Sequence, residues 1–101
     1  MDRKMMAQLQ QMQNKLVKAQ EELSTLMVEG TAGGGAVKVT MNGHRELRGL
    51  EISPEAVDPD DVETLQDMIT AAFNDASKKA QDLSESKLGG LTGGMSIPGL
   101  F

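Results

Sequence analysis

The sequence contains no cysteine, no tryptophan and no tyrosine, and its only aromatic residues are two phenylalanines. Without cysteine the chain cannot form a disulfide framework, a thiolate nucleophile or a cysteine-ligated zinc or iron–sulfur site. The one histidine, His44, has no candidate nucleophile near it, so we expect a turn or edge residue rather than a catalytic base. The sequence therefore predicts neither an enzyme nor a small-molecule substrate.

Long apolar runs are also absent from the 101-residue chain. No stretch approaches the roughly 20 apolar residues that span a bilayer, and the first residues reach glutamine before an apolar run of signal-peptide length. We therefore expect a soluble, intracellular protein that contacts no membrane. The chain has eight methionines but few other large side chains, so we expect it to complete a small core by pairing with a second copy.

Apolar residues from position 5 onward are spaced alternately four and three residues apart, which is the pattern of a heptad seam. The residues between them are mainly Gln, Lys and Glu, and the segment lacks glycine and proline. It predicts a helix of about 25 residues, or roughly 37 Å, which is longer than a small core can cover. The seam consists of Met5, Leu9, Met12, Leu16, Ala19, Leu23 and Leu26.

Three antiparallel strands are predicted after this helix. Residues 27–32 form a weak first strand, the glycines at 33–35 permit a turn, and residues 36–41 alternate between apolar and polar side chains. The Asn-Gly pair at 42–43 marks the next turn. A third strand follows from about His44 to Ile52.

The register of the second hairpin depends on its loop. A three-residue loop through His44 is favoured because it places Val39 opposite Leu47, whereas a two-residue loop places Val39 opposite Glu46. Leu50 is out of phase with Leu47, so we also expect a bulge or kink near Gly49.

A second helix is predicted from the Asp-Pro pair at 58–59, where Asp58 caps the helix and Pro59 takes its first position. Its apolar face continues to a predicted end near Lys87, because the glycines at 89–90 stop it. The fold class is therefore α+β, with residues 1–88 as one domain and residues 89–101 as a flexible, glycine-rich tail. The apolar face consists of Val62, Leu65, Ile69, Phe73, Ala76, Ala80 and Leu83.

Acidic residues crowd between positions 51 and 67, but their spacing is not that of a calcium-binding loop. Helix capping explains the central members of the group. The glycines at 33–35 lack the Lys-Ser/Thr pair and the following helix of a phosphate-binding loop, which favours a hairpin turn. We therefore expect no metal and no cofactor.

The net charge of −5 is distributed unevenly. Residues 1–20 carry four bases and one acid, whereas residues 51–67 carry seven acids and no base. Lysines on a helix surface are usually only solvated, but a chain polarised in this way can also present its positive part to an anionic polymer. The candidate phosphate contacts are Arg3, Lys4, Lys15 and Lys18, with Lys78, Lys79 and Lys87 as lesser candidates.

Four stretches follow one another along the chain, namely Gln8–Gln13, Val37–Gly43, Leu50–Pro54 and Ala71–Ala76, and the tail ends in Pro98-Gly99-Leu100-Phe101. In this order they resemble the YbaB/EbfC family of bacterial nucleoid-associated proteins. The resemblance covers nearly the whole chain. It implies a cytoplasmic homodimer of α-β-β-β-α protomers, shaped like tweezers with the long helices as prongs, that binds DNA and associates with the nucleoid.

We therefore expect a homodimer that binds duplex DNA mainly through phosphates, with a role in nucleoid organisation and gene regulation. The absence of tyrosine and tryptophan disfavours binding by base stacking on single strands. An alternative stays open, in which the protein is a non-enzymatic interaction module whose heptad helix binds a helix of a partner protein. The residues expected to join the two protomers are Val37, Val39, Met41, Leu47 and Phe73.

Overall fold

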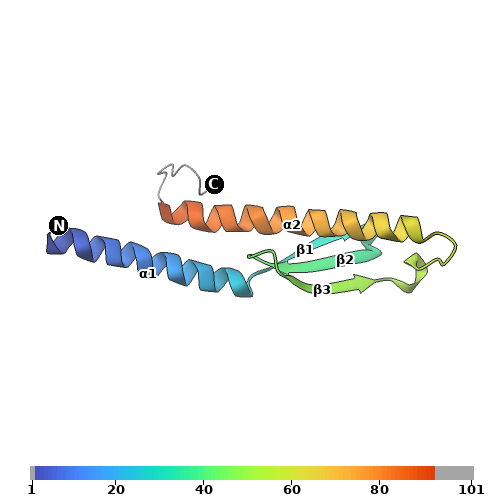
Figure 1. The fold of residues 1–101 in the computed structure, drawn as a ribbon, viewed down its shortest axis with the longest axis horizontal. Coiled ribbons are helices and arrows are strands. Elements are labelled where there is room, and N and C mark those ends of the chain that lie inside the picture. The colour runs from blue at the N-terminus through green and yellow to red at the C-terminus, as the bar shows by residue number, and fades with distance from the viewer. Residues whose placement is uncertain (1, 93–101) are drawn as a thin grey trace.

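The computed structural model describes residues 2–92 and has a helix at each end of the chain, with a three-stranded antiparallel sheet between them (Figure 1). The predicted α+β class and the predicted order of elements are confirmed. The long elements are α1 (Arg3–Thr25), β1 (Met27–Ala32), β2 (Val37–Asn42), β3 (Leu47–Ile52) and α2 (Val62–Thr92), and two 3-10 turns lie at Gly33–Gly35 (η1) and Pro54–Ala56 (η2).

Helix α1 begins with a side-chain cap, because Oδ1 of Asp2 accepts a hydrogen bond from the backbone N–H of Met5 at 2.7 Å. The absence of glycine and proline lets the helix continue for 23 residues, or about 34 Å. It ends where Leu26 takes an extended conformation, with φ −81° and ψ 131°. The predicted long N-terminal helix is confirmed.

Only the sheet-proximal part of the heptad seam is covered by the rest of the protomer. Ala19 and Leu23 are buried, and Leu16 is half-buried. Met5 and Leu9, by contrast, remain 51% and 54% exposed. The N-terminal part of α1 extends past the end of α2 (Figure 1), so this part of the seam has an uncovered apolar side.

The sheet has the strand order β1-β2-β3, and β1 pairs with β2 from Met27↔Asn42 to Ala32↔Val37. The turn between these two strands is η1. Its residues Gly33, Gly34 and Gly35 all have positive φ angles of 64°, 68° and 94°. Glycine adopts this backbone region without steric cost, so the three glycines make the predicted turn possible.

The pairing of β2 with β3 differs from the predicted register. Val39 pairs with Leu50 rather than with Leu47, and Leu47 pairs with Met41. The loop from Gly43 to Glu46 is longer than expected, so β3 begins at Leu47 and not at His44. The register shifts between Thr40 and Met41, which leaves Arg48 as the extra residue and confirms the predicted irregularity near Gly49.

Helix α2 packs mainly on β1 and β2 rather than on β3. The contact is close because Ala72 and Ala76 are small and Gly30 of β1 has no side chain. A Cβ on Gly30 would lie 2.2 Å from the carbonyl oxygen of Ala72. The core lies between this face of α2 and the apolar side of β2, and its buried residues are Val37, Val39, Met41, Ala72 and Ala76.

Both predicted ends of the second helix were wrong. Helix α2 begins at Val62, because Asp61 accepts a hydrogen bond from the backbone N–H of Thr64 at 3.3 Å and acts as the cap, while Asp58 closes the preceding turn. The helix also continues through Gly89 and Gly90 to Thr92. Glycine lowers helix stability by about 1 kcal/mol relative to alanine but does not forbid helical dihedrals. The predicted tail therefore overlaps α2, and its remaining residues, 93–101, lie outside the described part of the chain.

Candidate nucleic-acid interface

Four cationic side chains share one side of α1. At about 100° per residue they fall within an arc of about 120°, and the first and the last are separated by about 22 Å along the helix axis. All four are exposed, and within residues 2–92 none forms an ion pair. We call this surface the α1 basic stripe, which consists of Arg3, Lys4, Lys15 and Lys18.

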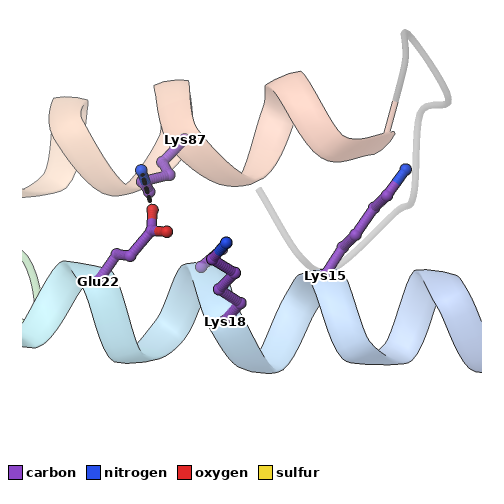
Figure 2. Close-up of a pocket in the computed structure, with 5 residues that line it drawn as sticks. Lys15, Lys18, Glu22 and Lys87 are labelled. Carbon is purple, nitrogen blue, oxygen red and sulfur yellow. Dashed lines mark ion pairs between the residues drawn. The ribbon is translucent and has the colours of Figure 1, made fainter.

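The stripe leads into an open cleft of about 220 Å³ between α1 and α2. Figure 2 shows Lys15, Lys18 and Glu22 reaching from α1 toward α2, and Lys87 reaching from α2 toward α1. Ala19 completes the lining and leaves room between the longer side chains. The cleft therefore brings three of the predicted lysines together with one carboxylate.

One ion pair crosses this cleft. Nζ of Lys87 lies 2.5 Å from Oε2 of Glu22. The hydrogen bond from Lys87, and then attraction to the charges of Lys87 and Lys18, lower the pKa of Glu22 below its usual value. Glu22 is therefore ionised at neutral pH and neutralises one of the three amines, so the cleft keeps an excess of positive charge.

The structure does not bring the other two predicted lysines into this cleft. Lys79 ties α2 to β1, because its Nζ donates to the carbonyl oxygen of Glu29 at 2.9 Å and to Asp75 at 3.2 Å. Thr31 donates its backbone N–H to the same carboxylate, and this bond, followed by the bond from Lys79, lowers the pKa of Asp75. Lys78 is exposed on α2. Lys79 is thus held by Glu29 and Asp75, whereas the side chain of Lys78 is exposed to solvent.

The acidic cluster between positions 51 and 67 lies toward the far end of the molecule from the start of α1 (Figure 1). The chain measures 69 Å along its longest axis, with the N-terminus at one end and the turns before α2 at the other (Figure 1). Within residues 2–92, no three side chains of histidine, aspartate or glutamate lie together in a group that could hold a metal ion. Neither described helix has a stretch long and apolar enough to cross a membrane.

The loop between β2 and β3 fixes the direction of α1, which sequence reasoning missed. Gly43 donates its N–H to the carbonyl oxygen of Leu23 at 2.8 Å, and Nε2 of His44 lies 2.8 Å from the carbonyl oxygen of Gln20. Asn42 is fully buried and donates to the carbonyl oxygen of Ser24 at 3.3 Å. The Asn-Gly pair signalled the turn, but its contacts with the helix depend on tertiary structure.

The residues predicted to join two protomers fall into two groups. Val37, Val39 and Met41 are fully buried inside the protomer, beneath α2, so they do not offer a surface of their own. Their alternation indicates an apolar face but not which element covers it. Leu47 and Phe73, by contrast, remain 54% and 44% exposed.

An apolar surface beside the core stays uncovered because α2 packs mainly on β1 and β2. Leu47 and Leu50 pair with Met41 and Val39 and therefore point to the same side of the sheet as the core. Leu50 nevertheless remains 46% exposed. Phe73 lies about 200° around α2 from Asp75, which faces β1, so Phe73 is on the flank toward β3. We call Leu47, Leu50 and Phe73 the β3 apolar face.

Comparison with known proteins gives consistent matches over nearly the whole chain. The profile described as the YbaB/EbfC DNA-binding family matches residues 1–95. A protein named nucleoid-associated protein from Pelotomaculum thermopropionicum is 59% identical over 98 residues, which cover 97% of this chain and 93% of the relative. A nucleoid-associated protein from Chloroflexus aurantiacus is 59% identical over 99 residues, which cover 98% of this chain and 97% of the relative.

A solved structure supports the fold. The crystal structure of an uncharacterized protein from Helicobacter pylori superimposes with a TM-score of 0.79 at 26% sequence identity. The match covers 92% of this chain and 99% of the other. The arrangement of two helices and a three-stranded sheet is therefore similar to one observed by crystallography.

Proposed function

Because this chain belongs to the YbaB/EbfC DNA-binding family, we propose that it binds duplex DNA as a homodimer, through phosphate contacts made by the α1 basic stripe of each protomer. The observation that carries this proposal is the set of cations on one side of α1, none of which is paired within residues 2–92. Cations without an internal partner are available to replace the counterions of DNA phosphates.

The net charge of −5 is compatible with this function. Electrostatic interactions are screened over about 8 Å at physiological ionic strength, whereas the protomer is 69 Å long. The acidic turns before α2 and the start of α1 lie at opposite ends of that axis (Figure 1). The affinity of the α1 basic stripe for a phosphate therefore depends on the charges near the stripe and not on the net charge of the chain.

The second protomer is proposed to cover the β3 apolar face. This face continues the core of one protomer, and a twofold axis through it would bury the same residues from both copies. Exposed apolar side chains next to a core are typical of a surface that another subunit covers. Such a dimer would carry two copies of α1, which is the tweezer-like arrangement expected for the family.

Duplex DNA is the proposed partner rather than a single strand. Stacking of unpaired bases uses aromatic side chains, and the chain has no tyrosine or tryptophan to supply them. Phosphate contacts fix a protein on DNA without reading its sequence, so the proposed sequence preference is weak. Such binding suits a cytoplasmic protein that organises the nucleoid and thereby influences gene expression.

Fluorescence anisotropy with a labelled duplex at several salt concentrations tests this function. If the dimer neutralises about four to six phosphates, the logarithm of the binding constant should fall with the logarithm of salt concentration with a slope of about −4 to −5. A single-stranded probe of the same length should bind more weakly. Binding that does not change with salt would contradict the phosphate mechanism.

A second candidate function rests on the uncovered part of the heptad seam. Met5 and Leu9 are exposed on α1 and could pack against a helix of a partner protein, as in a non-enzymatic interaction module. Changing Lys15 and Lys18 to Glu should abolish DNA binding and keep the dimer mass under the first function. Changing Met5 and Leu9 to Asp should have the larger effect under the second.

A further inference from the structure

We propose that the cleft between α1 and α2 is a binding site for one phosphate group, and that Glu22 occupies it as an internal competitor. The site would be formed by Lys15, Lys18 and Lys87. This proposal deepens the proposed function and rests on it, because it names the carboxylate that limits access of a DNA phosphate to the cationic cleft.

The positions of the side chains fit one small anion. Lys15, Lys18 and Glu22 project from the same flank of α1 over about 10 Å of helix, and Lys87 faces them from α2 (Figure 2). The open cleft has a volume of about 220 Å³. The small side chain of Ala19 keeps this space open. A phosphate group therefore has room between amines that come from two helices.

The charges in the cleft are unequal. Lys87 is paired with Glu22, but Lys15 and Lys18 have no ion-pair partner within residues 2–92. A DNA phosphate carries one negative charge, as a carboxylate does, and its two non-bridging oxygens can accept hydrogen bonds from more than one amine. Lys15 and Lys18 therefore still attract an anion while Glu22 is paired with Lys87. The free cleft is thus only partly neutralised.

Glu22 and an incoming phosphate would compete for Lys87. Both side chains of the Glu22–Lys87 pair are partly exposed, and pairs of this kind are held weakly. A phosphate that accepts hydrogen bonds from Lys87 would also repel the ionised Glu22. The carboxylate therefore lowers phosphate affinity in the free protein, and removal of its charge should raise that affinity.

The direct test uses the variant Glu22→Gln in the full chain, with Glu21→Gln as the matched control. The two changes remove the same charge from neighbouring positions, but Glu21 does not line the cleft. Glu22→Gln should bind duplex DNA about threefold to tenfold more tightly than the native protein. Glu21→Gln should change the affinity less than twofold. Equal effects of the two variants would overturn the proposal.

Inorganic pyrophosphate serves as a probe that needs no DNA. Its titration, followed by the NMR signals of the lysine side chains, should shift Lys15, Lys18 and Lys87 and should give a tighter constant for Glu22→Gln. If pyrophosphate and DNA both respond to Glu22→Gln, the site accepts phosphate from either source. If DNA alone responds, the ligand is a backbone phosphate. If pyrophosphate alone responds, the ligand is a free oligophosphate.

Lys87→Gln separates this proposal from the function itself, with Lys78→Gln as the control on the same helix. In the Glu22→Gln background, Lys87→Gln should cancel most of the gain in affinity, and Lys78→Gln should not. If Glu22→Gln and Lys87→Gln change neither DNA binding nor pyrophosphate binding, the cleft is not a phosphate site, and the α1 basic stripe is left intact. A pyrophosphate site without any DNA binding would overturn the proposed function and leave the cleft intact.

Discussion

Gly43 donates its backbone N–H to the carbonyl oxygen of Leu23 at 2.8 Å, and this bond joins the loop after β2 to the last turn of α1. The two residues are in such close contact that a Cβ on Gly43 would lie 2.6 Å from Cδ2 of Leu23 and 2.9 Å from its carbonyl oxygen. Because one of these atoms is the backbone carbonyl oxygen of Leu23, rotation of the leucine side chain cannot relieve the steric clash. The direction of α1, and hence of the α1 basic stripe, depends on this contact.

Gly43→Ala should therefore move α1 and destabilise the protomer by about 1–3 kcal/mol. Thermal unfolding followed by circular dichroism measures the stability, and anisotropy with a labelled duplex measures the effect on DNA binding. Gly49→Ala is the control, because a Cβ there would meet Thr40 at 3.8 Å, an ordinary contact distance. Equal melting temperatures for the two variants would show that the Gly43 contact does not hold α1.

The β3 apolar face gives a prediction about assembly. Leu50→Lys places a charge in the proposed interface but not in the protomer core, so the variant should stay folded and dissociate, with a dimer dissociation constant raised at least about tenfold. Val57→Lys is the control, because Val57 is also exposed but lies between η2 and α2. Light scattering after gel filtration measures the mass. A variant that keeps a dimer mass at low concentration would refute the interface.

Asp75 predicts a pH dependence of stability. Its pKa is lowered in the folded protein from the ordinary 3.8, first by the N–H of Thr31 and then by Lys79. A lowered folded pKa means that the stabilisation is fully present above the unfolded value of 3.8 and is lost as the pH falls through the lower folded pKa. The melting temperature of Asp75→Asn should therefore decline less between about pH 5 and pH 2.5 than that of the native protein.

Asp82→Asn is the matched control for this measurement, since Asp82 is exposed on the same helix. It removes the same charge without removing the acceptor of the Thr31 and Lys79 hydrogen bonds. A pH profile of Asp75→Asn that is superimposable on the native profile would show that the link between α2 and β1 does not depend on the carboxylate.

Local sequence patterns predicted the elements, but not how the elements meet. The apolar spacing along α1 and the alternation of β2 follow from helix and strand periods, so both elements were correctly predicted. The register of β3 was not, because Arg48 is an extra residue whose bulge breaks the period of two. The start of α2 was misplaced because Asp58 and Asp61 are both plausible caps, and only hydrogen-bond geometry separates them.

The candidate site was predicted only in part, because a sequence determines how side chains are arranged on one helix but not how two helices pack. The cations of α1 could be identified from the sequence, because all of them lie on one helix and the helical period places them on the same side of it. The approach of Lys87 to Glu22 joins residues from both ends of the chain and depends on how α2 packs. The exposure of Leu50 likewise depends on tertiary packing, because α2 covers β1 and β2 but not β3, and no local sequence pattern predicts this.

The most direct test of the α1 basic stripe is the salt dependence of duplex binding for a dimer that carries Lys15→Gln and Lys18→Gln. Each lost phosphate contact should reduce the slope by about 0.9, so this change on both protomers should reduce its magnitude by about 2 to 4 units. A control dimer with Lys38→Gln and Arg45→Gln loses the same charge at positions outside the candidate contacts and should change the slope by less than about 1 unit. An unaltered slope in the Lys15 and Lys18 variant, at native dimer mass, would contradict the account.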